Sequence, residues 1–136
     1  MKYELLSTRH AKYLLHAHMV FTPKYRKKIF TKEHLDVMRE VFENICKEND
    51  GELVEFDGEE DHVHLLVLYP PRIALATLIN SLKGVSSRKL RQQFPVFHEK
   101  YWGNNALWSR SYFVASVGGA PIEILKQYIE QQKTPD

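Results

Sequence analysis

Two histidines separated by one valine begin a strongly apolar segment, which reads DHVHLLV over residues 61–67. Side chains alternate between the two faces of a β-strand, so His62 and His64 are expected to share one face and Val63 to lie on the other. Two neighbouring imidazoles can bind a divalent metal ion. The structural alternative is a pair of ordinary histidines on a half-exposed sheet, and the surroundings must decide between the two.

The same spacing occurs nearer the N-terminus, where residues 15–19 read LHAHM. Spacing alone does not separate His16 and His18 from the later pair. The apolar run around the later pair continues to Tyr69. This run predicts a central strand, and polar groups buried on such a strand need partners. We therefore expect the later pair, and not the earlier one, to bind the metal.

Hydrophobic periodicity and turn residues predict alternating strands and helices. The expected elements are a strand over residues 13–22, a helix between Thr31 and Asn49, a strand over 52–57, the histidine strand up to Tyr69, a helix from about Ile73 to Gln93, a strand over 111–117 and a last helix from Pro121. Residues 97–108 are expected to form a loop. This order is that of the ferredoxin-like split βαβ plan, an α+β fold with helices packed on an antiparallel sheet.

The bulk properties predict one domain over residues 1–136, because domains commonly have about 100–200 residues. The single cysteine, Cys46, cannot form an intramolecular disulfide, and its helical pattern favours a core position over a reactive thiol. A reducing cytoplasm would suit it. The N-terminus lacks the apolar run of a secretory signal, and no segment approaches the ~20 apolar residues of a membrane span. A soluble cytoplasmic protein with no membrane partner is expected.

Basic residues gather in two places, although a net charge of +2 and a pI near 8.6 do not by themselves establish nucleic-acid binding. One cluster is KYRKK at residues 24–28, and the other joins Lys83 to RKLR at residues 88–91. An acidic segment over residues 52–61 stands against them. Basic clusters either contact phosphates or form solvated surface. The histidine strand lacks the aromatic residues of a base-stacking RNA platform.

The last predicted helix carries a tyrosine and a glutamine four residues apart, Tyr128 and Gln132. Residues at this spacing are neighbours along one side of a helix. They border the face marked by Ile122, Leu125 and Ile129. In the structural interpretation, Tyr128 completes the core and Gln132 is surface.

Five segments of the chain form an ordered set of motifs: HMVFTPKYRKKIF, DHVHLLV, LKGVSSRKLR, LWSRSYFVASVGG and YIEQQ. Taken in this order, they resemble the small HUH single-tyrosine transposases (TnpA type) of bacterial insertion sequences, which act on single-stranded DNA. They span nearly the whole chain, and several matches in order are far more specific than one motif. One departure is Arg110, which stands where the family often has proline.

In that family two histidines around a hydrophobic residue, with a glutamine four positions after the tyrosine, hold a divalent metal. The resemblance implies His62, His64 and Gln132 as metal ligands and Tyr128 as the nucleophile. Two imidazoles alone would suit zinc, manganese or nickel, whereas an amide oxygen and a substrate phosphate favour Mg²⁺ or Mn²⁺. The DNA-binding residues are expected among Lys24, Tyr25, Arg26, Lys27, Lys28, Lys83, Arg88 and Arg110.

These residue types suit the cleavage of a phosphodiester. The phosphate oxygens are negative, and a tyrosine with an ordinary pKa of about 10 is mostly protonated at neutral pH, so both call for a cation. Attack by tyrosine on phosphorus would leave a phosphotyrosine that conserves the bond for rejoining. The resemblance implies a 5′-phosphotyrosine link, a free 3′-OH and recognition of DNA hairpins near the element's ends. It also implies a homodimer in which Tyr128 of one subunit serves the histidine pair of the other.

Other functions stay open at this stage. One is a domesticated relative that processes repeated palindromes, and another is a replication nickase with the same site, against which the short chain argues. A third, from a different class, is a DNA- or RNA-binding regulator whose histidines are structural. A covalent protein–DNA adduct would distinguish the enzymes from the regulator.

Overall fold

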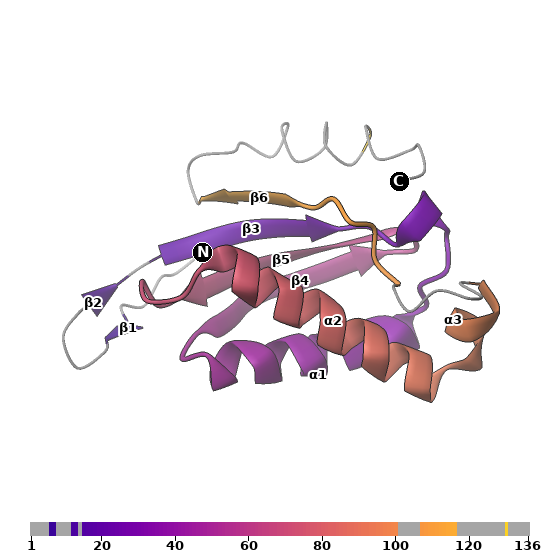
Figure 1. Cartoon of the computed structure of the whole chain (residues 1–136), viewed down its shortest axis with the longest axis horizontal. Coiled ribbons are helices and arrows are strands. Elements are labelled where there is room, and N and C mark those ends of the chain that lie inside the picture. Colours follow the sequence, from indigo (N-terminus) through magenta and orange to yellow (C-terminus); the bar gives the residue numbers. More distant parts are fainter. Residues whose placement is uncertain (1–5, 8–11, 14, 101–106, 117–129, 131–136) are drawn as a thin grey trace.

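The computed structural model describes residues 6–7, 12–13, 15–100, 107–116 and Glu130 (Figure 1). Its main feature is a four-stranded sheet in the order β4-β5-β3-β6, in which every neighbouring pair is antiparallel. The elements are β1 (Leu6–Ser7), β2 (Lys12–Tyr13), β3 (Leu15–Phe21), the 3₁₀ helix η1 (Lys24–Arg26), α1 (Lys32–Glu48), β4 (Glu52–Glu59), β5 (His62–Tyr69), α2 (Leu75–Gln93), α3 (Pro95–Lys100) and β6 (Phe113–Ser116).

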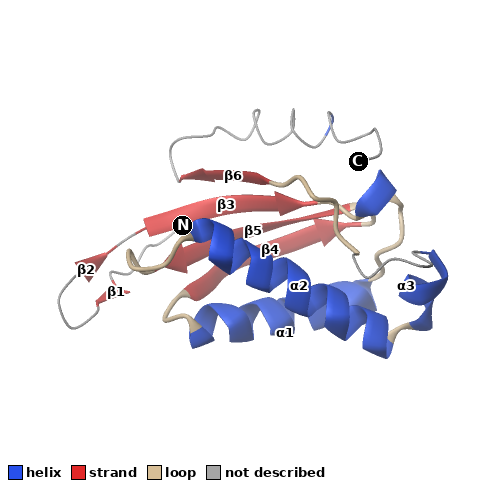
Figure 2. Ribbon diagram, in the orientation of Figure 1, coloured by secondary structure: helices blue, strands red, loops and turns tan. Residues whose placement is uncertain are grey.

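The order β3-α1-β4-β5-α2-β6 and the order of strands in the sheet confirm the predicted α+β split βαβ plan. Figure 2 shows α1 and α2 side by side on one face of the sheet. Val63, Leu65 and Val67 of β5 turn toward this helical layer and lie in one core with Met38 and Phe42 of α1. Among the described residues, no helix is long and apolar enough to cross a membrane.

Helix α1 begins at a reciprocal cap. Oγ1 of Thr31 accepts a hydrogen bond from the His34 N–H at 3.3 Å, and Nδ1 of His34 accepts one from the Thr31 N–H at 3.1 Å. This arrangement is a capping box, with histidine in the place usually taken by glutamate or glutamine. The His34 ring also packs edge-on against Phe94 and Phe97, with centroids 4.5 and 4.7 Å away. The predicted start of the helix is confirmed.

The other end of α1 closes with a Schellman motif. Asp50, and not the glycine after it, takes the left-handed conformation with φ 59°. The Gly51 N–H donates to the Cys46 carbonyl at 2.8 Å. Gly51 is needed for a different reason, because a Cβ at this position would lie 2.4 Å from the carbonyl oxygen of Leu68. The prediction that residues 49–51 stop the helix is therefore confirmed, with the roles of the residues now assigned.

Helix α2 runs through Gly84, as predicted, and ends at Gln93, with Phe94 as its C-cap. Phe94 is extended, with φ −128° and ψ 108°, because the following Pro95 disfavours helical geometry at the residue before it. Proline is tolerated in the first turn of a helix, and α3 begins directly at Pro95. The expectation of a loop from residue 97 is therefore wrong for its first part.

Other boundaries differ slightly from those predicted. The first strand of the sheet starts at Leu15, β4 extends to Glu59, and β6 starts at Phe113. The predicted end of β6 at residue 117 falls outside the described residues. The short β1-β2 pair was not predicted, because two-residue strands carry too little pattern to detect. The predicted last helix from Pro121 falls outside the described residues, except for Glu130.

Cys46 lies in the core, with 1% of its surface exposed. Burial, followed by the negative charge of Glu43, raises the pKa of the Cys46 thiol to about 12. A thiol that does not ionise near neutral pH is a poor nucleophile. The sequence-based interpretation of Cys46 as a core residue is confirmed.

Candidate functional site

The predicted histidine pair lies at the start of β5, next to the turn that joins it to β4. His62 and His64 point to the face of the sheet opposite the core, together with Leu66 and Leu68, whereas Val63 points into the core. Leu66 and Leu68 are also buried, each with 1% of its surface exposed. The predicted shared face and the predicted central strand are both confirmed, since β5 lies between β4 and β3.

The earlier histidine pair lies on the same face. In the antiparallel register, His16 is opposite Leu68 and His18 is opposite Leu66. Strand β3 is also an inner strand, flanked by β5 and β6. The prediction that only the later pair lies on a central strand is therefore wrong. Position along the sheet and neighbouring side chains distinguish them instead.

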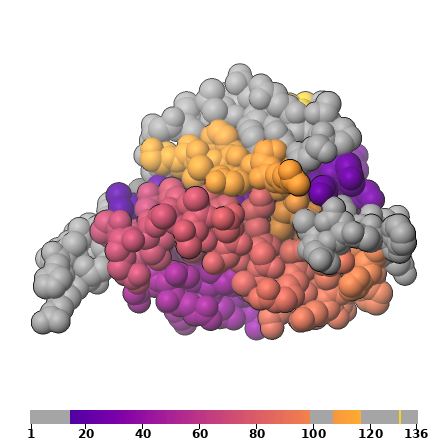
Figure 3. All heavy atoms as spheres, viewed as in Figure 1, coloured from indigo at the N-terminus to yellow at the C-terminus, as the bar shows by residue number. Residues whose placement is uncertain are grey.

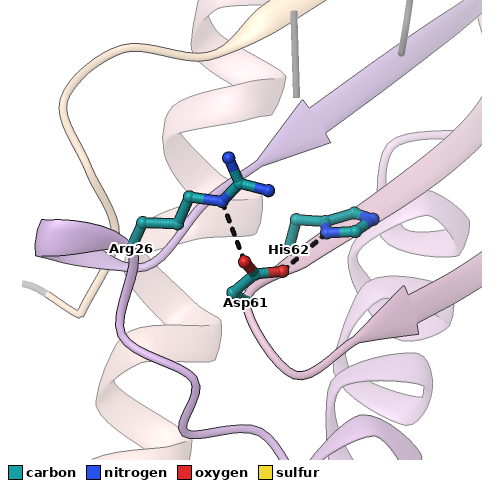
Figure 4. Close-up of polar contacts among 3 residues, drawn as sticks. All are labelled: Arg26, Asp61 and His62. Atoms are coloured by element: carbon teal, nitrogen blue, oxygen red, sulfur yellow. Dashed lines mark hydrogen bonds and ion pairs between the residues drawn. The ribbon is translucent and has the colours of Figure 1, made fainter. Parts of the chain in front are cut away.

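The carboxylate of Asp61 contacts one ring nitrogen of His62. Nδ1 of His62 lies 2.9 Å from Oδ1 of Asp61, and Nε of Arg26 donates to the other oxygen, Oδ2, at 2.9 Å (Figure 4). The side chains of these residues are only 13% exposed for Arg26, 16% for Asp61 and 13% for His62. Figure 4 shows the second ring nitrogen of His62, Nε2, turned away from Asp61. Nδ1 of His62 thus contacts Asp61, whereas Nε2 does not face this carboxylate.

The charge of this group is set by competing effects. Burial alone would raise the pKa of the Asp61 carboxyl. The hydrogen bond from His62 and the positive charge of Arg26 outweigh burial and hold that pKa below its ordinary value. Asp61 is therefore ionised at neutral pH and accepts a hydrogen bond from Arg26.

His64 has a more open environment. Its side chain is 43% exposed, and its Nε2 lies 3.8 Å from Oδ2 of Asp57, which is 78% exposed. Asp57 lies directly opposite His64 on β4, and Glu59 lies opposite His62. Two carboxylates therefore flank the two imidazoles on one face of the sheet. This concentration of negative charge beside two imidazoles favours a cation.

His62 and His64 can supply two of the ligands expected for a divalent metal. The Nε2 atom of His62 faces away from its carboxylate partner, and the imidazole of His64 is accessible. In the described part of the chain, no group of three or more His, Cys, Asp or Glu side chains is placed to hold a metal. The further predicted ligand, Gln132, and the predicted nucleophile, Tyr128, lie outside the described residues.

Arg26 reaches Asp61 from an unusual backbone. Tyr25 and Arg26 both have positive φ, 63° and 47°. Left-handed geometry costs a residue other than glycine about 1–2 kcal/mol. The segment that follows is fixed by Glu60, whose carbonyl accepts from the N–H groups of Ile29 and Phe30, both at 3.0 Å. These bonds and the Arg26–Asp61 ion pair compensate for the strain and join the basic segment to the β4-β5 turn.

The predicted DNA-binding residue Lys83 makes contacts within the protein. Its Nζ donates to the carbonyls of Ser109 and Arg110, at 2.7 and 3.3 Å. The same ammonium lies 5.1 Å from the ring centroid of Tyr112 and 6.0 Å from that of Phe21. Lys83 thus fastens α2 to the segment before β6. Figure 3 shows α2 directly beneath β6 on this face of the molecule.

The remaining predicted DNA-binding residues are exposed or half-buried. Arg88 lines an open hollow of about 390 Å³ on α2, formed with Gly84, Arg91, Gln92 and His98. Tyr25, Lys28 and Arg110 are exposed, whereas Lys24 and Lys27 are half-buried. The Lys27 ammonium lies 5.7 Å from the ring centroid of Tyr25. The structure brings Lys24 close to residue 107, because the Lys24 N–H donates to the Leu107 carbonyl at 2.8 Å.

Sequence reasoning missed the partners of the histidines. Asp61 directly precedes His62 in the sequence, so its closeness to the imidazole could have been inferred. Arg26 was assigned only to a basic cluster, and its contact across 35 residues left no local trace. Ser86 was also missed. Its hydroxyl accepts from the Trp108 indole N–H at 2.9 Å and secures the segment that Lys83 binds.

Comparison with known proteins places this chain in a family. Residues 11–132 match the family model described as "Transposase IS200 like". The ISDra2 transposase TnpA of Deinococcus radiodurans is 32% identical over 120 residues, covering 88% of this chain and 85% of that protein. The transposase for insertion sequence element IS200 of Salmonella typhimurium is 32% identical over 130 residues, covering 96% and 84%.

Solved structures agree with these matches. The crystal structure of a proposed transposase from Deinococcus radiodurans superposes with a TM-score of 0.84 and 31% identity, covering 95% of this chain and 98% of that one. A REP-associated tyrosine transposase, solved bound to a REP hairpin, has a TM-score of 0.57 at 10% identity, covering 93% and 68%, and shares the fold. The chain therefore belongs to the IS200-like transposase family, which confirms the resemblance to the single-tyrosine HUH transposases of small insertion sequences.

Proposed function

We propose that this transposase cleaves and rejoins single-stranded DNA at the ends of an insertion sequence, and that it depends on a divalent metal held by His62, His64 and Gln132. The observation that carries the proposal is the placement of the two imidazoles. Both lie on one sheet face, one with its Nε2 directed away from a carboxylate and the other accessible. Together with membership of this family, this placement supports a binding site for Mg²⁺ or Mn²⁺.

Flanking carboxylates support the need for a cation. Asp57 and Glu59 lie opposite the two histidines, so a DNA phosphate brought to this face would meet negative charge. A divalent ion, when bound, offsets that charge and polarises the scissile phosphate. The protein's own contribution is to position the phosphate beside His62 and His64 and to supply the nucleophile from Tyr128.

The chemistry is a transesterification. The Tyr128 oxygen attacks phosphorus and loses its proton, the bond from phosphorus to the 3′ oxygen breaks, and that oxygen leaves as a 3′-OH. The product is a 5′-phosphotyrosine, and attack by another 3′-OH reverses the step and restores the tyrosine. No external energy source is required, because the phosphodiester bond is exchanged and not hydrolysed.

We also propose DNA hairpins near the element's ends as the recognised structures, and a homodimer with shared sites as the active form. One of the structurally similar proteins is a tyrosine transposase bound to a hairpin, which supports the first part. Lys28, Arg88 and Arg110 are basic and exposed, which supports contacts with DNA phosphates.

The decisive experiment is a covalent adduct assay. Purified protein is incubated with a 5′- and 3′-labelled hairpin oligonucleotide from the element's end, with Mg²⁺, Mn²⁺ or EDTA. We expect a denaturant-resistant protein–DNA band that requires metal and is absent in Tyr128→Phe, while hairpin binding by that variant is retained. An adduct mapped by mass spectrometry to another tyrosine would contradict the assignment, and binding without any adduct would favour a non-catalytic regulator.

A further inference from the structure

We propose that Asp61, clamped by Arg26, is a positioning residue that fixes the tautomer of His62, so that Nδ1 carries the proton and Nε2 stays open for the metal. The inference rests on the proposed metal site, and it assigns roles to two residues outside the ligand set. Its basis is the chain of contacts from Arg26 through Asp61 to His62, with both bonds at 2.9 Å.

The geometry leaves Asp61 a single role toward each neighbour. A guanidinium can only donate, so Oδ2 of Asp61 accepts from Nε of Arg26. Oδ1 is then the atom that faces Nδ1 of His62, and an ionised carboxylate can only accept. A neutral imidazole carries one proton, so placing it on Nδ1 leaves Nε2 with a lone pair.

His62 and His64 differ in how closely a carboxylate contacts the ring and in how exposed that carboxylate is. The side chains of Arg26, Asp61 and His62 are 13–16% exposed, so water competes only weakly for their hydrogen bonds. The nearest carboxylate of His64 is that of Asp57, 3.8 Å away and 78% exposed. Asp57 therefore provides a matched control, a carboxylate beside the second histidine that should leave its tautomer unspecified.

Arg26 provides a direct test of the inference, because its guanidinium determines which way an asparagine amide at position 61 is turned. In Asp61→Asn, the amide oxygen must turn to Arg26, since the amide nitrogen and the guanidinium are both donors. The amide nitrogen then faces Nδ1 of His62, which must accept, and the proton moves to Nε2. The substitution is nearly isosteric, yet it should select the tautomer that cannot bind metal through Nε2.

Removing Arg26 as well should restore the site. In the double variant Asp61→Asn with Arg26→Met, the amide is no longer held by a donor and can present its oxygen to His62. The proton returns to Nδ1 and Nε2 is open again. A purely structural role for the ion pair predicts the opposite ranking, with the double variant at least as impaired as Asp61→Asn.

The first measurement needs neither metal nor DNA. Imidazole ¹⁵N spectra of the full chain are recorded well above the ordinary imidazole pKa of about 6.5, with the His62 signals assigned by loss in His62→Ala. We expect the Nδ1–H form in wild type, in Arg26→Met and in the double variant, and the Nε2–H form in Asp61→Asn. Persistence of the Nδ1–H form in folded Asp61→Asn would overturn the inference.

The second measurement uses MnCl₂ as the probe, with free Mn²⁺ quantified by electron paramagnetic resonance. We expect Mn²⁺ affinity to fall about 10–100-fold in Asp61→Asn and to recover in part in the double variant. In Asp57→Asn it should fall less, because that change removes a flanking charge but leaves the His62 tautomer unaltered. A double variant no better than Asp61→Asn would overturn the inference. If wild type binds no Mn²⁺, the metal role in the proposed function fails instead, while the nitrogen spectra still decide the role of Asp61.

Discussion

His18 of β3 lies directly opposite Leu66 of β5, so the two His-x-His pairs share one face of the sheet. They occupy different parts of it, because Val20 is the residue that lies opposite His64. The later pair is therefore at the end where β3 runs into η1, beside Arg26 and Asp61. The earlier pair lies toward the other end of the two strands.

This relationship makes the earlier pair the natural control for metal binding. Replacing His62 and His64 together with alanine should lower metal-dependent cleavage about 100-fold or more, because both imidazole ligands are lost. Replacing His16 and His18 with alanine should leave cleavage within a few-fold of wild type. Cleavage is measured on a labelled hairpin oligonucleotide, after circular dichroism has shown that each variant is folded. The reverse ranking would assign the metal to the earlier pair.

Shared active sites can be tested by mixing two inactive variants. His62→Ala and Tyr128→Phe should each lack cleavage activity alone. If sites form across a two-fold interface, a mixed dimer has one site with both lesions and one intact site, so activity returns. Tagged co-purification establishes that mixed dimers form, and strand cleavage is then assayed. Verified mixed dimers without activity would require each site to be built within one chain.

The basic segment should contribute unequally to DNA affinity. Neutralising exposed Lys28 with Lys28→Gln should reduce the slope of log affinity against log salt by roughly 0.7 for a single-stranded substrate, if it contacts a phosphate. Arg26→Gln should change that slope less, because the Arg26 guanidinium binds Asp61 and the side chain is 13% exposed. Affinities for the same oligonucleotide are compared across salt concentrations by fluorescence anisotropy. An unchanged slope in Lys28→Gln would mark this residue as solvated surface.

Two glycines should respond to alanine with opposite signs. Gly51→Ala should lower the free energy of unfolding by about 1–3 kcal/mol, because the new Cβ would lie 2.4 Å from a backbone oxygen of β5. Gly84→Ala should raise it by about 1 kcal/mol, because Gly84 is inside a helix and nothing lies within 4 Å of the added carbon. Urea denaturation of both variants checks the signs. Equal effects would contradict the steric account.

His34 should give the protein part of its sensitivity to acid. Burial lowers the pKa of His34 below its ordinary value of 6.5, although Glu33 and a backbone contact at Ile29 oppose the shift. The unfolded chain therefore binds this proton more readily, and the stability that neutral His34 provides is present above pH 6.5 and lost as the pH falls through the folded pKa.

His34→Gln removes this titration and retains a residue suited to the capping box. Its free energy of unfolding should fall less between about pH 7 and 5 than that of the wild type, measured by urea denaturation at each pH. Identical pH profiles would show that another group carries the acid sensitivity.

Local patterns were sufficient for the periodic elements of this fold. Thr31 marked the start of α1, and the apolar spacing of α2 carried the prediction through Gly84. Local signals also placed His62 and His64 on one face, because alternation along a strand is a short-range property. The family resemblance then supplied Tyr128 and Gln132, which no periodicity identifies.

Long-range contacts could not be predicted in the same way. The ion pair of Arg26 and Asp61 joins residues 35 positions apart, and a basic run shows no preference for a carboxylate elsewhere in the chain. The central place of β3 was missed because its sequence mixes polar and apolar residues, and only sheet order reveals its two neighbours. At the end of α1, glycine was the obvious left-handed residue, yet Asp50 takes that conformation, and Gly51 instead allows close packing against β5.

The acidic character of β4 has a consequence for how copies of this protein can associate. Glu52, Glu55, Asp57 and Glu59 are exposed along this outer strand, and a bulge between Leu53 and Glu55 interrupts its pairing with β5. Two copies that approached through this edge would bring like charges into register along an irregular backbone. This charge and the bulge disfavour aggregation by sheet extension along β4, and they make this edge a poor surface for association between copies.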